Sequence, residues 1–276
     1  MSTKGKLLRD RSPSTVEASV RQLAAVVNFA HSRRDTLYSA AFSPKPPSAV
    51  DNTPSYRAGI NELAAMFRYC LRPERKPEDT DKVYANRIAQ RDSLLRFLRI
   101  SVATWCRPDA AHDFSTAPDR RQWISNARVA QLNPKGRPQT RKYRPAVPVV
   151  ERMAVMLDRE PAGPYVPVGS VRKAMEAMLD DIKLPRDRET GQKLIRRSMA
   201  TLARKRLGEE NSAQWERMLG HRKASTSDLY ALFEPGMLGR AVAATDAIID
   251  EIEAITPGAF TGNTPELKMI NGGKNG

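Results

Sequence analysis

Cysteine, histidine and aromatic residues are scarce in this chain, and each shortage argues against a class of function. The two cysteines, Cys70 and Cys106, have no CxxC spacing, so the sequence predicts neither a zinc site nor a disulfide framework. The three histidines form no cluster with Asp or Glu at metal-ligand spacing, so we expect no metal and no other cofactor. Aromatic residues make up 6% of the chain, which disfavours recognition by stacking on unpaired bases.

Long apolar runs are missing as well. No segment approaches the roughly 18 consecutive apolar residues that a membrane-spanning helix needs. The first residues, MSTKGKLLRDRSPS, are polar and basic and lack the apolar core of a signal peptide. We therefore expect a soluble, cytoplasmic protein with no membrane partner.

Acidic residues are under-represented, because 31 Asp and Glu stand against 46 Lys and Arg and leave a net charge of +15. Such a balance usually indicates a polyanionic partner, most commonly nucleic acid. A solvated basic surface without such a partner is the alternative. The length of 276 residues is sufficient for two domains and one sizeable core.

Helical periodicity dominates the rest of the chain. Residues 14–30 are predicted to form an amphipathic helix, opened by a capping box of Ser14 and Glu17. Four prolines in the segment 43–54 indicate a linker or a long surface loop. Further helices are predicted over 55–70, 82–105, 150–158, 168–183, 191–207, 212–219 and 237–256, with a short one beginning near Ser225.

Two short strands are predicted at 127–132 and 143–149, while 107–122 is polar and predicted to be irregular. The turn-forming residues between the strands predict a β-hairpin with a long tip. The predicted fold class is therefore mainly α with a small antiparallel β-hairpin or sheet. The hairpin tip carries cations and no acid: Lys135, Arg137, Arg141, Lys142 and Arg144.

Attack on a phosphodiester needs a nucleophile, positive charge around the phosphate oxygens and a proton donor for the departing oxygen. Tyr230 is the candidate nucleophile, and its usual pKa of about 10 means that it needs nearby cations or a base. Arg196 suits bidentate phosphate binding. His221 is a candidate proton shuttle or phosphate donor, and Lys142 is a candidate acid for the leaving oxygen.

Each of these residues also has a plain structural interpretation. One tyrosine among seven is usually a core or surface aromatic, and the LGH sequence that ends at His221 is a plausible helix stop. Arg196 lies among several other cations and could belong to a solvated basic face. Lys142 could be a nonspecific contact with the DNA backbone.

The order and spacing of these residues resemble the catalytic end of the tyrosine recombinases, the phage-integrase family. That family has His or Lys, two spacers and Arg, then LGH, then Tyr nine residues later. The segments KLIRRSMATLARKR and MLGHRKASTSDLY match it at Lys193, Arg196, His221 and Tyr230. The segment ATWCRPDAA matches the upstream arginine motif and places the second arginine at Arg107, with Asp109 as the nearby acid.

The resemblance covers roughly residues 55–255 and implies a tyrosine-recombinase-like catalytic domain of the DNA breaking-rejoining fold. It implies a metal- and ATP-independent enzyme of phage or mobile-element origin that acts on double-stranded DNA in recombination or integration, and hence a nucleoid-associated protein. The family carries a catalytic lysine in the hairpin, for which we choose Lys142, with Lys135 in reserve. The expected DNA contacts are Lys135, Arg137, Arg141, Arg144, Arg197 and Arg222.

The resemblance also sets the expected domains. Residues 1–45 would be a partial helical core-binding region, 46–54 a Pro-rich linker, 55–256 the catalytic domain and 257–276 a flexible tail. The last helix, predicted at 237–256, often docks onto a neighbouring protomer of a tetramer in this family. Its apolar stripe fits that role, although packing within the chain explains the stripe equally well.

Two other functions remain open at this level. The first is a shortened or degenerate relative that binds DNA through the basic hairpin and the predicted 191–207 helix without catalysis. The second is an activity like that of a type IB topoisomerase, which shares the Arg, Lys, His and Tyr chemistry but relaxes circles without exchanging partners.

Overall fold

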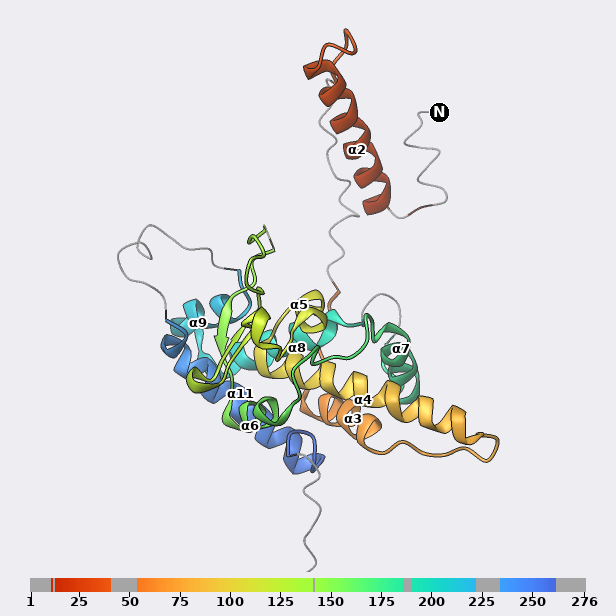
Figure 1. Cartoon of the computed structure of the whole chain (residues 1–276), viewed down its shortest axis with the longest axis vertical. Helices are drawn as coiled ribbons and strands as arrows, with labels where there is room; N and C mark the ends of the chain where they lie inside the picture. Colours follow the sequence, from red (N-terminus) through yellow and green to blue (C-terminus); the bar gives the residue numbers. More distant parts are fainter. Residues whose placement is uncertain are drawn as a thin grey trace, which may run out of the picture. The chain divides into compact units, whose positions relative to one another are not determined.

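The computed structural model describes residues 11, 13–40, 54–140, 142–185, 190–221 and 234–261, drawn as coloured ribbon in Figure 1. The chain divides into two compact units, Met1–Pro54 and Ser55–Gly276. The division falls at the end of the proline-rich segment 43–54. Proline-rich segments are typical connectors between separately packed units.

The first unit contains the helix α2, Pro13–Ser32, which is close to the predicted range of 14–30. Its apolar residues do not all face a core. Val16 is buried, whereas Leu23, Val26 and Phe29 are exposed among the residues that the structure describes.

The second unit is built around the helix α4, Asp81–Thr104, which was predicted at 82–105. Thr80 caps its start, since the Thr80 hydroxyl accepts a hydrogen bond from the Val83 N–H group. Its C-terminal half is buried on all sides, including the polar Ser101 and Thr104. A helix that is buried all round belongs at the centre of a helical layer, and α4 packs against α3 (Ile60–Leu71) and α8 (Lys193–Leu207) (Figure 1).

The last helix, α11 (Gly239–Ile255), follows the short 3-10 helix η5, Pro235–Leu238. Its apolar stripe is buried against α3 and α8 of the same chain. The one polar member of the stripe, Thr245, accepts a hydrogen bond of 3.1 Å from Nε1 of Trp105. Packing within the chain therefore accounts for the stripe, and it is not left free to dock onto a neighbouring protomer. The buried residues are Ala241, Ala244, Thr245, Ile248, Ile249 and Ile252.

The residues just after α11 were predicted to open a flexible tail, but the described part, 257–261, is packed. Phe260 is buried, and its ring lies 5.2 Å from the ring of Phe67. The buried guanidinium of Arg99 donates to the carbonyl oxygens of Ala259, at 2.6 Å, and Gly258, at 3.0 Å. The buried aromatic side chain and the satisfied arginine hold these residues against the core.

The sheet has three antiparallel strands in the order β1 (Trp123–Ile124), β2 (Val129–Gln131) and β3 (Ala146–Pro148). The pair β2–β3 is the predicted hairpin, in the register Val129↔Pro148. Pro148 has no N–H group to donate, and it lies on an edge strand, where proline is tolerated. The strand β1 was not predicted.

The region 107–122 is also more regular than predicted. It contains the helix α5, Pro108–Asp113, and Pro108 occupies the first helical position, where proline is favoured because that N–H group needs no partner. The remaining elements are η2 (Pro118–Arg120), η3 (Ser125–Ala127), α6 (Glu151–Arg159), α7 (Arg172–Asp181), η4 (Glu209–Asn211) and α9 (Ser212–Met218).

No helix in the described ranges combines the length and apolarity required to cross a bilayer.

Candidate active site

Arg107 lies in the short turn that joins α4 to α5. The helix α4 ends where Trp105 adopts a left-handed conformation with φ of 51°. Arg107 then becomes the N-cap residue of α5. Its side chain is half-buried, and Nη1 donates a hydrogen bond of 2.6 Å to the carbonyl oxygen of Tyr143, next to β3. The guanidinium is thus fixed between the turn and the hairpin.

Arg196 lies in the first turns of α8, and its guanidinium connects two other segments. Nη1 donates to the carbonyl oxygen of Trp105 at 2.7 Å, and Nη2 donates to the carbonyl oxygen of Leu219. Nη2 also lies 3.2 Å from Nε2 of His221. An arginine can only donate, so Nε2 accepts here and the neutral imidazole carries its proton on Nδ1.

His221 is placed by the turn that closes α9. Gly220 has a φ of +62°, and its N–H group bonds to the Arg217 carbonyl at 2.9 Å. The N–H group of His221 bonds to the Glu216 carbonyl, also at 2.9 Å. These two bonds form a Schellman motif. The predicted helix stop therefore exists, and the same turn brings His221 to Arg196.

Positive charge and burial lower the pKa values of two of these groups, Arg196 and His221. Burial, followed by the positive charge of Arg107, lowers the pKa of Arg196 to about 10, so Arg196 stays charged at neutral pH. The pKa of His221 is also lowered from its usual 6.5, first by desolvation of the imidazole and then by the charges of Arg196 and Arg107. Two arginines held close together despite their mutual repulsion form a site that favours binding of an anion.

The partners of the two arginines are neutral. Within the part of the chain that the structure describes, neither Arg107 nor Arg196 forms an ion pair with a carboxylate. Their donors reach backbone carbonyl oxygens and the imidazole of His221. Backbone carbonyls orient a guanidinium without cancelling its charge, so both charges remain for a ligand.

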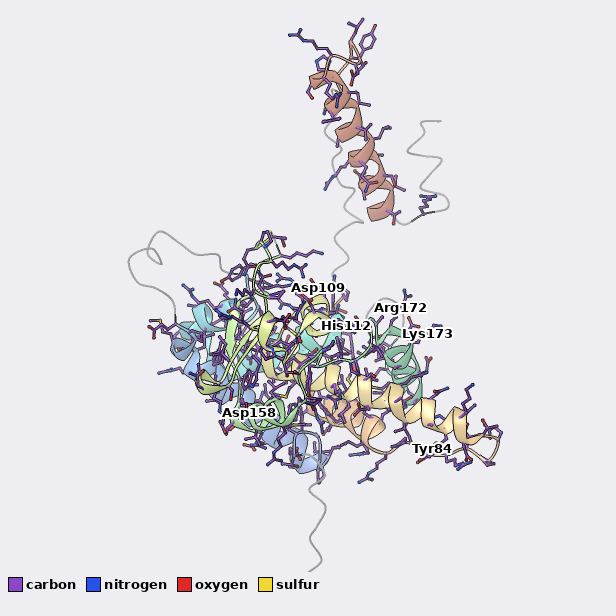
Figure 2. All side chains as sticks on the ribbon, in the orientation of Figure 1. Tyr84, Asp109, His112, Asp158, Arg172 and Lys173 are labelled. Atoms are coloured by element: carbon purple, nitrogen blue, oxygen red, sulfur yellow. The ribbon has the colours of Figure 1, made fainter. Side chains whose placement is uncertain are left out.

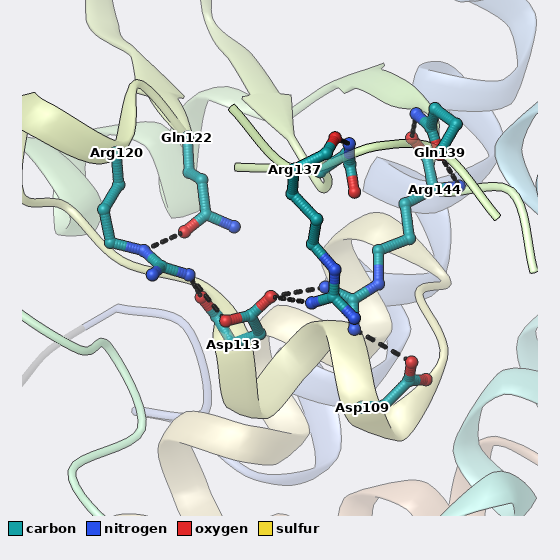
Figure 3. Close-up of polar contacts among 8 residues, drawn as sticks. Asp109, Asp113, Arg120, Gln122, Arg137, Gln139 and Arg144 are labelled. Atoms are coloured by element: carbon teal, nitrogen blue, oxygen red, sulfur yellow. Dashed lines mark hydrogen bonds and ion pairs between the residues drawn. The ribbon is translucent and has the colours of Figure 1, made fainter. Parts of the chain in front are cut away.

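Arg144 behaves differently from its expected role as a DNA contact. Its side chain is only 6% exposed, and it donates to Oδ2 of Asp113 at 2.5 Å and to Oδ2 of Asp109 at 2.9 Å (Figure 3). A guanidinium enclosed in this way does not reach a DNA phosphate, so we assign Arg144 a structural role. The other cations on Asp113 are Arg120, at 2.5 Å, and Arg137, at 2.8 Å.

The remaining predicted cations that the structure describes lie at the surface or near it. Lys142 is exposed in the hairpin. Burial raises the pKa of Asp109, but the hydrogen bond and charge of Arg144 and, to a smaller extent, the charge of Lys142 outweigh that effect and lower it. Lys193 is exposed at the first position of α8, one turn before Arg196. The reserve lysine, Lys135, is exposed, Arg137 is partly exposed beside Asp113, and Arg197 is partly buried on α8.

Three predicted residues, Tyr230, Arg222 and Arg141, lie outside the described residues, as does the short helix predicted from Ser225. Tyr230 follows His221 by nine positions in the sequence, and the described chain resumes at Glu234 before η5. The role of Tyr230 stays a prediction from the sequence.

Several groups that hold Arg107 and Arg196 in place were not predicted. The carbonyl oxygens of Trp105, Tyr143 and Leu219 hold the two arginines, and backbone acceptors leave no mark in a sequence. Asp113 did leave a signal, since it follows Asp109 by four positions and therefore shares its face of a helix. The polar composition of 107–122 predicts an irregular segment and so hides this helical spacing.

A cavity of about 370 Å³ lies elsewhere in this unit, between α4 and α7. It is lined by Gln90, Ser93, Val168 and the start of α7, and Figure 2 labels Arg172 and Lys173 there. None of the predicted site residues lines it. In the described residues, no group of three or more His, Cys, Asp or Glu side chains is placed to hold a metal ion.

Comparison with protein-family models, with curated proteins and with solved structures found no match. The function proposed below therefore rests on the residues and their geometry.

Proposed function

We propose that this chain is a tyrosine-type site-specific recombinase, which cleaves and rejoins double-stranded DNA through a covalent 3′-phosphotyrosyl link. The reaction conserves the energy of the broken phosphodiester in the new bond to tyrosine. Neither ATP nor a metal ion is a reactant in that scheme. The proposal applies to the catalytic unit, residues 55–256, and to the nucleophile Tyr230.

The observation that carries the proposal is the convergence of Arg107, Arg196 and His221. They come from three separate segments, the α4–α5 turn, α8 and the end of α9. The spacing of the motifs in the sequence predicts that these three residues bind the same phosphate. The guanidiniums of Arg107 and Arg196 are held by backbone carbonyl oxygens, which do not neutralise their charge. A phosphate-binding site needs such charge.

The chemistry assigns one task to each group. The two guanidiniums would bind the non-bridging oxygens of the scissile phosphate and stabilise the charge that develops there. The Oη atom of Tyr230 would give its proton to solvent water and bond to phosphorus, while the bond from phosphorus to the 5′ oxygen breaks. His221 would donate from its imidazole to a phosphate oxygen.

The leaving 5′ oxygen needs a proton, and Lys142 is our candidate donor. The lysine is exposed in the hairpin and lies close enough to Asp109 for its charge to act on that carboxylate, which in turn acts on Arg196. Rejoining is the reverse reaction, in which the 5′ hydroxyl of a partner duplex attacks the phosphotyrosine and Lys142 takes its proton back.

A covalent-trapping assay tests the proposal. Purified protein is mixed, in EDTA, with nicked duplexes tiled across the DNA that flanks its gene, and products are resolved on a denaturing gel. We expect a protease-sensitive shifted band with the wild type and with Tyr38→Phe, which removes the hydroxyl of an exposed tyrosine in the first unit. The Tyr230→Phe variant should bind DNA but give no band.

Three other outcomes are informative. An equal band with Tyr230→Phe would remove Tyr230 from the mechanism. Salt-sensitive binding without any band would favour a relative that binds DNA and does not cut it. Relaxed circles without exchange between duplexes would favour a topoisomerase.

A further inference from the structure

Residues 143–145, just before β3, form a junction that contacts both Arg107 and the turn before His221. With Arg196, these two residues are called the cluster. The carbonyl oxygen of Tyr143 accepts the hydrogen bond from Arg107. Gly220 approaches the same carbonyl and the ring of Pro145 so closely that a Cβ atom there would lie 2.7 Å from the oxygen and 2.8 Å from Cδ. The position of this segment therefore sets both the guanidinium of Arg107 and the turn that carries His221.

Arg144, the central residue of the junction, is what fixes the segment to α5. Its side chain is 6% exposed and is bound at both ends of its fork, by Asp109 and by Asp113. Its backbone is bound as well, because Gln139 accepts from the Arg144 N–H group at 3.1 Å and donates to its carbonyl at 2.8 Å (Figure 3). A buried guanidinium with two carboxylates holds a more definite geometry than an exposed ion pair does.

Arg144 also pairs with Asp109, an acid whose charge acts on Arg196. Asp109 lies close enough to Arg196 for its negative charge to raise the pKa of that arginine, against the larger effect of burial. The bond from Arg144 engages one oxygen of Asp109 and reduces its attraction for other cations. Without Arg144, the carboxylate of Asp109 would compete with a phosphate for Arg196.

We propose that Arg144 is a positioning residue: held between Asp109 and Asp113, it fixes residues 143–145 and thereby places Arg107 and the His221 turn for a phosphate. The proposal rests on the proposed function only for the identity of that ligand. The geometric part, that Arg144 controls where the charge of Arg107 lies, is independent of any reaction.

The geometric part is tested by following the titration of His221 by NMR. The protein has only three histidines, and the pKa of His221 is depressed in part by Arg107, so it reports the position of that charge. Among the residues that the structure describes, the charged groups that act on this imidazole are Arg196, Arg107 and Glu216. Arg107→Ala should raise the pKa of His221, and Arg144→Ala should raise it in the same direction.

Two further variants show whether the effect passes through Arg107. If it does, the double variant Arg107→Ala with Arg144→Ala should titrate like Arg107→Ala alone, because coupled residues are not additive. The matched control is Arg137→Ala, which removes a second guanidinium from Asp113 but leaves residues 143–145 in place. This control should leave the titration of His221 unchanged.

The conservative variant covers the case in which Arg144→Ala does not fold. In Arg144→Lys the ammonium keeps the charge but reaches one carboxylate instead of two, so we expect a smaller shift in the same direction. The proposal is overturned if Arg144→Lys and every folded Arg144 variant titrate as the wild type does. It is equally overturned if the shift from Arg144→Ala adds in full to that from Arg107→Ala.

DNA cleavage gives a second readout. Misplacement of a catalytic group by about 1 Å can cost about 100-fold in rate, so Arg144→Ala should lower the cleavage rate of bound DNA by about 10- to 100-fold. Its DNA affinity should stay near that of the wild type, whereas Arg137→Ala should lose affinity. If the wild type cleaves and Arg144→Ala cleaves equally well, the positioning role is wrong and the proposed function stands. If the wild type does not cleave, the titration still decides the role of Arg144.

Discussion

Replacing Gly220 by alanine probes the turn that joins His221 to the hairpin. Two features at this position oppose a side chain. The φ angle is +62°, a left-handed conformation that favours glycine, and an added Cβ atom would lie 2.7 Å from the carbonyl oxygen of Tyr143. The contacted atom belongs to the backbone of a segment that Arg107 and Arg144 hold, so it cannot move away easily.

The expected cost follows from these two features. A left-handed conformation costs an L-residue about 1–2 kcal/mol. Forcing an extra carbon into a well-packed site typically adds about 1–3 kcal/mol. We therefore expect Gly220→Ala to lower the free energy of unfolding by about 2–5 kcal/mol, a large share of the roughly 5–15 kcal/mol of a typical domain.

The matched control is Gly136→Ala in the hairpin tip. Gly136 also has a positive φ, of +81°, but a Cβ atom there would meet nothing within 4 Å. Its cost should be that of the backbone conformation alone, about 1–2 kcal/mol. Urea unfolding, followed by circular dichroism, gives both values. Equal losses for the two variants would show that the close approach of Gly220 to Tyr143 does not constrain the protein.

Four other predictions concern the site and its charges. Arg196→Ala should lower the DNA cleavage rate by about 10²- to 10³-fold, since it removes a preorganised donor, and a small drop would indicate a surface role. Lys142→Ala should slow cleavage of normal DNA but spare a substrate with a better 5′ leaving group; equal losses on both would make Lys142 a phosphate contact. Lys135→Ala should reduce the slope of log affinity against log salt by about 0.9, and an unchanged slope would remove it from the interface. Stability should fall on acidification through about pH 6.5. Burial lowers the pKa values of His112 and His221 in the folded protein, and neighbouring charges lower that of His221 further. The unfolded chain therefore binds more protons than the folded protein below that pH. The unfolding free energy measured across that range should lose part of this dependence in His221→Gln, and an unchanged profile would contradict the assigned shift.

The helical spacing of apolar residues predicted the long helices well, because the same spacing places those residues on the buried face of a helix. The ranges 82–105 and 191–207 became α4 and α8 within two residues at each end. The helix α5 was missed, since six residues are too few for a periodic signal. Pro108, at its first position, was the available clue.

Motif spacing named Arg107, Arg196 and His221 as candidates for one site, and the structure brings all three close together. Arg144 was expected to contact DNA because of the composition of the hairpin tip, and its burial was not predicted. Its neighbours in the sequence are basic, so it was expected in a solvated tip. Its burial depends on Asp109 and Asp113, which come from α5 and meet the hairpin only in the folded chain. Ion pairs across tertiary contacts have no fixed spacing in a sequence.

The apolar stripe of the last helix illustrates a similar limit. A stripe predicts that a helix face is covered, and it does not predict by what. In the structure the cover is α3 and α8 of the same chain, with Thr245 bound to Trp105.

The most direct test of the central claim is mass spectrometry of the DNA-linked peptide. Protein trapped on a nicked duplex in EDTA is digested with nuclease and trypsin. Cleavage after Lys223 and Arg240 releases the peptide ASTSDLYALFEPGMLGR, residues 224–240. We predict that fragmentation places a 3′-linked nucleotide on Tyr230, and that Arg196→Ala yields far less of this peptide. A nucleotide on another residue, or no adduct on DNA that the protein demonstrably binds, would contradict the account.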